Sequence, residues 1–184
     1  MLKRIWNKLF PKKYTLEEWS KVTIEGLRKQ GASIGENVDI FLSNIEGGAI
    51  APLLKIGDNV TITGTKILLH DANTKKELGY TKLGRVSIGN NVFIGYGAII
   101  LPNVSIGSNV IVGAGCVVRN DIPDNSVVIG NPCRIIMTYQ EYMSKQKKKM
   151  EENVCLDCSL DQLDSSIHTE EKHKLFSLGK GFIR

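Results

Sequence analysis

Residues 86–118 read VSIGNNVFIGYGAIILPNVSIGSNVIVGAGCVV, and a branched apolar residue returns in this stretch at every sixth position. The series consists of Ile88, Ile94, Ile100, Ile106, Val112 and Val118. A second series of small or apolar residues follows four positions later, and it consists of Val92, Ala98, Val104, Val110 and Cys116. Apolar positions with this spacing do not stay on one face of a helix with about 3.6 residues per turn, so the pattern excludes a helical bundle.

The phrase Ile-Gly-x-Asn-Val occurs four times, as IGENV at 34–38, IGDNV at 56–60, IGNNV at 88–92 and IGSNV at 106–110. A six-residue unit of strand and turn is too small to bury its apolar side alone, so successive coils must stack. Asparagine and glycine recur because they tolerate positive φ at turns. The repeat therefore predicts an all-β solenoid over residues 31–137, with Ile stacked on Ile and Val on Val inside it.

Composition narrows the classes of partner. The 184 residues are 42% hydrophobic and 23% charged, which is ordinary for one globular domain with appended segments. The net charge of +5 is modest and suits an anionic small ligand; the basic residues are dispersed apart from a short run at 145–149, so no nucleic acid is expected. No apolar run is long enough to span a membrane, and the first residues lack the features of a secretory signal. We therefore expect a cytoplasmic protein with reduced cysteines.

The repeat is interrupted between Leu69 and Val86 by the polar segment HDANTKKELGYTKLGR. This segment predicts a loop at 70–85 that leaves the solenoid. His70 is its first residue and the only histidine of the repeat region. With an ordinary pKa of about 6.5, imidazole is suited to accept a proton from a hydroxyl at neutral pH. A histidine at the corner of a coil can also be a surface residue with a structural hydrogen bond.

Three features together resemble a known family: the repeat, the phrase LLHDANTK at 68–75, and the segment VVRNDIPDNSVVIGNPCRII at 117–136. They are similar to the hexapeptide-repeat acyltransferases, within them to the O-acetyltransferases of sugars and capsular polysaccharides. The resemblance implies a left-handed parallel β-helix, because the period itself does not report the hand. It also implies transfer of an acetyl group from acetyl-CoA to a sugar or polysaccharide precursor, by a homotrimer with active sites between subunits.

In that family the interrupting loop begins with the catalytic histidine, so the resemblance makes His70 the general base. A carboxylate should orient its ring, and Asp71 and Glu46 are both candidates. Asp71 is adjacent, but neighbouring side chains on a strand point apart, so it can instead contact the acceptor. Glu46 lies about one coil away if a coil consists of three six-residue units. Asn44 and Phe93 match family positions beside the acceptor.

The resemblance places acetyl-CoA in a groove parallel to the solenoid axis, and no metal is expected. Tyr96 and Ala114 match positions whose backbone contacts the pantetheine arm. Arg134 matches a basic residue near the adenosine phosphates, to which an arginine binds well. Arg119 and Asn120 replace the usual Thr-Lys pair, so a phosphate contact at this turn depends on the arginine.

Both ends of the chain carry further signals. Thr15–Lys29, within an N-terminal segment 1–30, reads as a helix with Thr15 as N-cap and Glu18 three residues later. Residues 1–10 form an amphipathic basic segment, which either packs on the solenoid or lies on the inner membrane surface. The C-terminal segment 138–184 begins with a charged helix over 138–152. Its tail holds Cys155, Cys158, His168 and His173, whose spacing is too short for a usual zinc finger, so a loose tail is the preferred reading.

Four other functions are weighed against O-acetylation. An N-acetyltransferase of amino sugars and a xenobiotic acetyltransferase would use the same fold and base. A non-catalytic β-helix that serves assembly would retain the repeat without turnover. A zinc carbonic anhydrase needs three converging histidines, and a repeat region with only His70 does not supply them.

Overall fold

The computed structural model describes residues 15–153, 155–156 and 181–183. The segment 1–10 and the residues Cys158, His168 and His173, on which two predictions rest, lie outside the described residues. The chain divides into two compact units, Met1–Tyr139 and Gln140–Arg184, which are described separately below.

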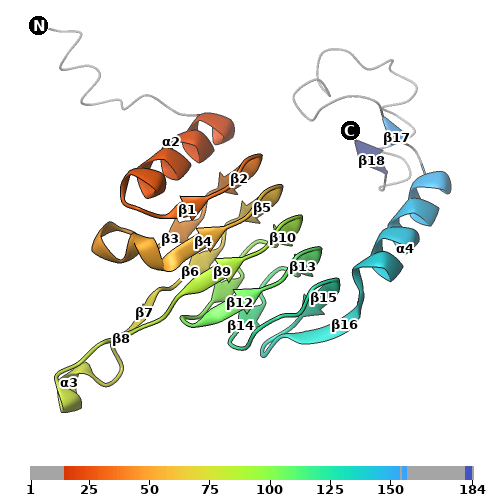
Figure 1. The fold of residues 1–184 in the computed structure, drawn as a ribbon. Coiled ribbons are helices and arrows are strands. Elements are labelled where there is room, and N and C mark those ends of the chain that lie inside the picture. The colour runs from red at the N-terminus through yellow and green to blue at the C-terminus, as the bar shows by residue number, and fades with distance from the viewer. Residues whose placement is uncertain (1–14, 154, 157–180, 184) are drawn as a thin grey trace, which may run out of the picture. The chain divides into compact units, whose positions relative to one another are not determined.

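Three sheets of stacked strands form the walls of the first unit (Figure 1). Sheet A contains β1 (Ser33–Ile34), β4 (Leu54–Ile56), β9 (Val86–Ile88) and β12 (Val104–Ile106). Sheet B contains β2 (Val38–Phe41), β5 (Val60–Thr63), β10 (Val92–Ile94), β13 (Val110–Val112), β15 (Ser126–Ile129) and the antiparallel β16 (Arg134–Thr138). Sheet C contains β3 (Asn44–Ile45), β6 (Lys66–Ile67), β11 (Ile99–Ile100) and β14 (Val117–Val118). Each full turn of the chain adds one strand to each sheet, which confirms the predicted left-handed parallel β-helix.

The register of the coils matches the six-residue period. Val92 pairs with Val60 on one side and with Val110 on the other, and Ile94 pairs with Ile62 and Val112. All members of the two apolar series are buried in one continuous core. Each buried Ile or Val contributes roughly 1.5–3 kcal/mol, so the stacked interior supplies most of the driving force for folding.

The two cysteines of the repeat region have no disulfide, as expected. Cys116 lies in the core and Cys133 packs against it. Burial raises the pKa of the Cys116 thiol, because the thiolate would lose its hydration. Cys116 therefore acts as a small apolar core residue rather than as a nucleophile.

Asparagines line one corner of the β-helix in the left-handed conformation, with φ between 53° and 57° at Asn37, Asn59, Asn91, Asn109 and Asn125. Their side chains form a ladder in which each amide nitrogen donates to the oxygen of the next asparagine at 2.9–3.1 Å. The glycine before this corner is needed for close stacking. A Cβ at Gly89 would lie 2.7 Å from the backbone carbon of Gly107 in the next coil, so only glycine fits there.

Helix α2 (Leu16–Lys29) forms where a helix was predicted, and it packs against the first coil. The Thr15 hydroxyl accepts the Glu18 amide hydrogen and the Glu18 carboxylate accepts that of Thr15, so the predicted capping box is present. Ser20 faces the solenoid, and its hydroxyl accepts a hydrogen bond from the Ile40 amide at 2.8 Å. The helix thus closes the end of the core that would otherwise be exposed.

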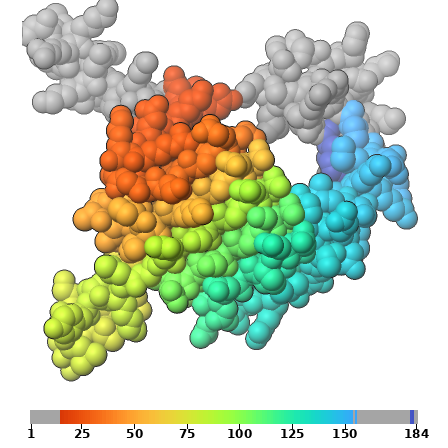
Figure 2. Space-filling view, in the orientation of Figure 1, coloured from red at the N-terminus to blue at the C-terminus, as the bar shows by residue number. Residues whose placement is uncertain are grey.

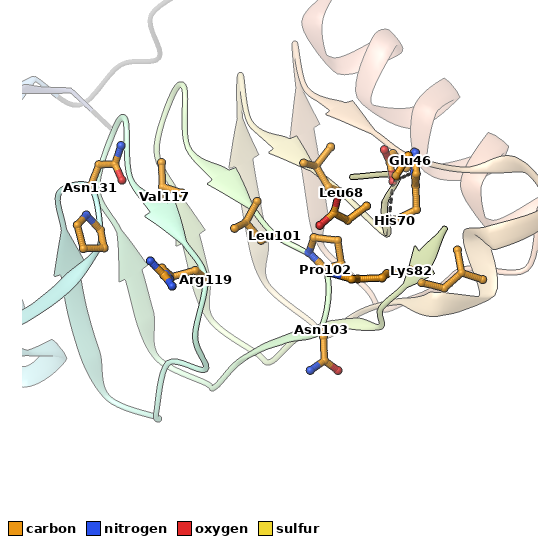
Figure 3. A pocket seen from close by; sticks show the side chains of 14 residues that line it. Glu46, Leu68, His70, Lys82, Leu101, Pro102, Asn103, Val117, Arg119 and Asn131 are labelled. Atoms are coloured by element: carbon orange, nitrogen blue, oxygen red, sulfur yellow. Dashed lines mark hydrogen bonds and ion pairs between the residues drawn. The ribbon is translucent and has the colours of Figure 1, made fainter. Parts of the chain in front are cut away.

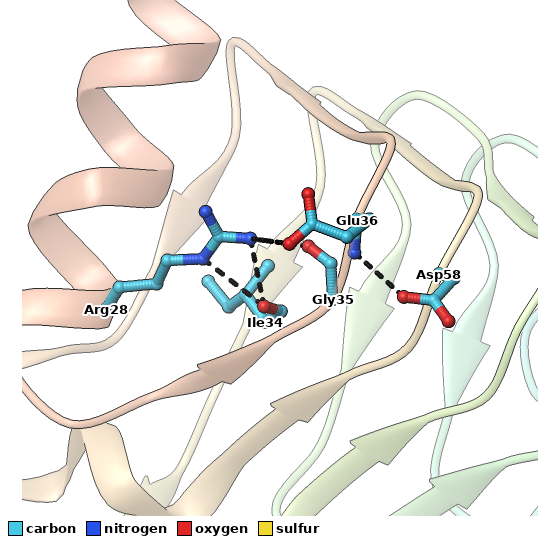
Figure 4. A network of polar contacts seen from close by, with 5 residues as sticks. All are labelled: Arg28, Ile34, Gly35, Glu36 and Asp58. Atoms are coloured by element: carbon cyan, nitrogen blue, oxygen red, sulfur yellow. Dashed lines mark hydrogen bonds and ion pairs between the residues drawn. The ribbon is translucent and has the colours of Figure 1, made fainter.

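A polar network fixes the C-terminal end of α2 to the first coil (Figure 4). The Arg28 guanidinium donates to the Ile34 carbonyl at 3.0 Å and lies 3.7 Å from the Glu36 carboxylate. The Glu36 amide in turn donates to the Asp58 carboxylate in the next coil at 2.8 Å. Arg28 therefore links the helix to the backbone of β1, which is the edge strand of sheet A.

Two insertions leave the solenoid at its corners. The 3-10 helix η1 (Gly48–Leu53) lengthens the first coil, so that Asn44 pairs with Lys66, 22 residues later, rather than 18. At 70–85, where a loop was predicted, the chain forms a hairpin of β7 (His70–Asp71) and β8 (Lys82–Leu83) with the short helix α3 (Lys75–Leu78) at its tip. Figure 2 shows this insertion projecting from the body of the solenoid.

The second unit begins within α4 (Tyr139–Glu151), at its second residue, and this helix confirms the one predicted over 138–152. A short parallel pair follows, β17 (Cys155–Leu156) and β18 (Phe182–Ile183). Within the part of the chain that the structure describes, no cluster of three or more His, Cys, Asp or Glu residues could hold a metal ion. None of the described helices has the length and apolar character needed to cross a membrane. The cytoplasmic location stays a prediction.

Asn91 tests how much the asparagine ladder contributes to stability. Asn91→Ala removes an amide that donates to Asn109 and accepts from Asn59, and it places alanine in a left-handed conformation that costs roughly 1–2 kcal/mol. With the two lost hydrogen bonds at about 1 kcal/mol each, we expect the free energy of unfolding to fall by about 3–4 kcal/mol, measured by urea titration. Asn91→Gly also loses the hydrogen bonds but avoids the backbone strain, so its stability should lie between that of the wild type and that of Asn91→Ala. An alanine variant as stable as the wild type would contradict the role of the ladder.

Candidate active site

His70 stands where the chain leaves sheet C after β6 and enters the hairpin. Its side chain is 42% exposed, and its Nδ1 atom lies 2.9 Å from the Glu46 Oε2 atom, on a carboxylate that is only 20% exposed. Glu46 follows β3 in the preceding coil and precedes His70 by 24 residues. This separation exceeds one regular coil because η1 is inserted between them.

The same carboxylate oxygen also binds the backbone. Glu46 Oε2 accepts hydrogen bonds from the amides of Leu69 and His70, the latter at 3.0 Å. Because a carboxylate only accepts at these contacts, the His70 Nδ1 atom carries the hydrogen, and in the neutral ring the Nε2 atom carries the lone pair. Glu46 thus fixes the tautomer, the ring and the backbone from which the ring projects.

Of the two candidate orienting groups, Glu46 and not Asp71 contacts the His70 ring. Asp71 is directed elsewhere, and its Oδ1 atom accepts a hydrogen bond from the Asn73 amide at 2.9 Å. It still lines the same groove as His70, as does its cross-strand neighbour Lys82. Glu46 is therefore the partner of the ring, and Asp71 is free to face a ligand.

A groove of about 1010 Å³ runs along the outside of sheet C, parallel to the stack of coils (Figure 3). Glu46 and His70 lie at one end, and Arg119 and Asn131 lie at the other. Its floor is apolar and is formed by Leu68, Leu101 and Val117 from successive coils. The backbone bonds from Leu68 to Ile100 and from Leu101 to Val118, both 3.0 Å, hold these floor residues in register.

Of the residues predicted for the site, the groove brings together His70, Glu46, Asp71 and Arg119. The others do not line it: Asn44, Phe93, Tyr96, Ala114, Asn120 and Arg134. Phe93 lies on the outer face of sheet B, 43% exposed, in a separate hollow with Thr61, Ile111 and Tyr139. The predicted roles of these six residues stay hypotheses. A groove between subunits would also be lined by a second chain, and the single chain does not include that surface.

The sequence reading missed several residues of the groove. A glycine follows the first apolar series at 89, 95, 107 and 113, whereas Leu101 stands at the corresponding position and is followed by Pro102; this irregularity was the available signal, because both residues line the groove. Lys82 had no signal, since the inserted segment follows no period. Its place became visible only when the hairpin paired Lys82 with Asp71 and Leu83 with His70.

Comparison with known proteins gives consistent matches. A family model described as bacterial transferase hexapeptide (six repeats) matches residues 85–120. Protein CapG of Staphylococcus aureus is 44% identical over 126 residues, which cover 65% of this chain and 73% of CapG. The galactoside O-acetyltransferase of Lactococcus lactis subsp. lactis is 41% identical over 101 residues, which cover 54% of this chain and 44% of that enzyme.

A solved structure supports the fold. The chain superimposes with a TM-score of 0.52 on a hexapeptide-repeat acetyltransferase of Vibrio cholerae O1 biovar eltor that was crystallised with acetyl coenzyme A. The match covers 68% of this chain and 79% of that one at 22% sequence identity. At this identity the similarity shows the shared β-helix and nothing about the ligand of the present chain.

The His70–Glu46 contact makes a prediction about the imidazole tautomer. Nitrogen-15 NMR of the neutral ring should show the hydrogen on Nδ1, because Glu46 accepts it there. In Glu46→Ala the ring should revert to the Nε2–H form that imidazole prefers in water. Asp71→Ala is the matched control and should leave the wild-type tautomer unchanged. An Nε2-protonated neutral ring in the wild type would refute the assigned hydrogen bond.

Proposed function

Because the chain belongs to the hexapeptide-repeat acetyltransferase family, we propose that it transfers an acetyl group from acetyl-CoA to a hydroxyl of a sugar or polysaccharide precursor, with His70 as general base. One observation carries the proposal. The Glu46 carboxylate holds the His70 Nδ1 atom at 2.9 Å, so the ring presents its Nε2 atom as a proton acceptor beside a long groove.

The chemistry follows from that arrangement. The Nε2 atom of His70 takes the proton of the sugar hydroxyl while the oxygen of that hydroxyl attacks the thioester carbonyl. The imidazolium that forms is stabilised by the adjacent Glu46 carboxylate. When the carbon–sulfur bond breaks, the imidazolium returns its proton to the leaving thiolate. The products are an acetyl ester and free CoA thiol, and the base is regenerated.

The groove has the character that a CoA thioester requires. Leu68 and Leu101 offer an apolar floor for the pantetheine arm. Arg119 lies at the end away from His70, and we assign it to bind phosphate through charge-assisted hydrogen bonds. Arg134 and Asn120 are exposed and stay candidates for further phosphate contacts, as Tyr96 and Ala114 do for the backbone of the arm.

The acceptor class is taken from the relatives. The name of the Lactococcus relative states O-acetylation of a galactoside, and this favours a sugar hydroxyl over the amine or xenobiotic acceptors of the alternative readings. Asp71, which lines the groove and does not hold the His70 ring, is the proposed acceptor contact. The same proposal includes contacts of Asn44 and Phe93 with the acceptor, which would be a glycan.

We also propose that the chain works as a homotrimer with the groove between subunits. The groove is open along the outside of sheet C, so a second chain is needed to enclose the thioester and exclude water. Sedimentation equilibrium should give a mass three times the 20.4 kDa of one chain. A monomer that is fully active at assay concentration would contradict the shared site.

His70→Ala is the direct test of the base. Thiol release from acetyl-CoA, followed across a panel of sugars and sugar nucleotides, should fall by at least ~100-fold in kcat, which is the usual contribution of a general base. Binding of CoA, measured by calorimetry, should not change, because the variant leaves the groove floor and Arg119 intact.

The outcomes separate the alternatives. Unchanged turnover in His70→Ala would refute the assignment of the base. Acetylated amines as the product would select N-acetylation. The absence of CoA-dependent turnover with every acceptor, in a trimer that folds normally, would favour the assembly module.

A further inference from the structure

Lys82 is a charged residue of the groove that the proposed reaction does not use. It lies in β8 of the inserted hairpin, directly across from Asp71 and one residue before Leu83, which pairs with His70. The hairpin therefore holds a cation at the same end of the groove as the base.

Among the described residues, Lys82 makes no ion pair within 4.0 Å, although Asp71 is its cross-strand neighbour. Glu46 is engaged by the His70 ring and by two backbone amides, and the Asp71 Oδ1 atom accepts the Asn73 amide. Lys82 is exposed and lines the groove, so its ammonium is available to bind an anionic group of a ligand there.

The position of Lys82 decides which ligand it serves. In CoA the pantetheine arm separates the thioester sulfur from the phosphates. If the thioester lies at His70, the phosphates lie far along the groove, towards Arg119 at its opposite end (Figure 3). Lys82 is then too close to the reacting carbonyl to bind the CoA phosphates, and the molecule on its side of the base is the acceptor.

We propose that Lys82 forms a subsite for an oxyanion of the acceptor, so that the enzyme selects a sugar carrying a phosphate or a carboxylate near the acetylated hydroxyl. The inference rests on the proposed function, and it adds that the acceptor sugar carries a negative charge. The ammonium donates charge-assisted hydrogen bonds to the oxyanion, and Asp71 beside it accepts from a neutral hydroxyl of the same sugar. The pair would fix the acceptor in one orientation relative to His70.

Binding of matched probes tests the subsite and identifies the source of the anion. Calorimetry on the full chain, with CoA present, would compare glucose 1-phosphate, UDP-glucose and glucuronate with glucose. We expect one of the anionic probes to bind at least tenfold more tightly than glucose. Lys82→Met, which keeps the length but removes the charge, should abolish this preference, with a loss of about 10- to 100-fold. Lys82→Arg should restore most of it.

Two matched controls define specificity. Lys75→Met removes a charge from the same insertion but outside the groove, and it should leave probe binding unchanged. Steady-state kinetics should then separate the two cations. Lys82→Met should raise KM for the acceptor and leave KM for acetyl-CoA unchanged, and Arg119→Ala should do the reverse.

Several results would overturn the inference: anionic probes that bind no better than glucose, equal binding to wild type and Lys82→Met, or a Lys82→Met effect on KM for acetyl-CoA. Failure of the proposed function would look different. In that case the charged probe would still bind in a Lys82-dependent way, but no acetyl group would be transferred to it.

Discussion

The in-register stacking of parallel coils is the constraint on which the site depends. A slip of one residue between neighbouring coils would turn Ile94 and its partners out of the core, because side chains alternate between the two faces of a strand. Extra residues can therefore enter only where the chain turns from one sheet to the next. The insertions at 48–53 and at 70–85 both obey this rule, since the strands on either side of them pair without a bulge. A corner is thus the position where polar groups can be added without loss of the core.

Glu46 connects the coil that contains the insertion at 48–53 to the start of the insertion at 70–85. The segment at 48–53 lengthens one coil, and the hairpin starts in the next coil at His70. The Glu46 carboxylate crosses between them and binds the ring together with the two amides at the point of departure. The hydrogen bonds that the backbone loses when it leaves sheet C are replaced by this carboxylate. Positioning of the His70 ring and closure of the local backbone are therefore a single interaction, and one cannot be altered without the other.

The groove is polarised along its length. One end holds the His70–Glu46 pair and Lys82, the floor is apolar, and the far end carries Arg119. A ligand with an anionic head and a long, weakly polar arm has one favourable direction in such a groove, with its reactive end at the histidine. Within the proposed reaction, this asymmetry assigns the two cations to different substrates, since a single long thioester cannot reach both with its phosphates.

The sequence by itself determined that the chain forms a stacked six-residue solenoid, because such a period buries its branched residues only when successive coils stack; the hand of the coil was implied by the family resemblance. It also marked the corner at which His70 stands, since a break in a strict period is visible without coordinates. It did not decide between Asp71 and Glu46, because that choice depends on contacts between coils separated by an irregular insertion. The hairpin within 70–85, the groove floor at Leu68 and Leu101, and the place of Lys82 were likewise decided by tertiary structure. These residues follow no repeat, and pairing between distant segments alone brings them to one groove.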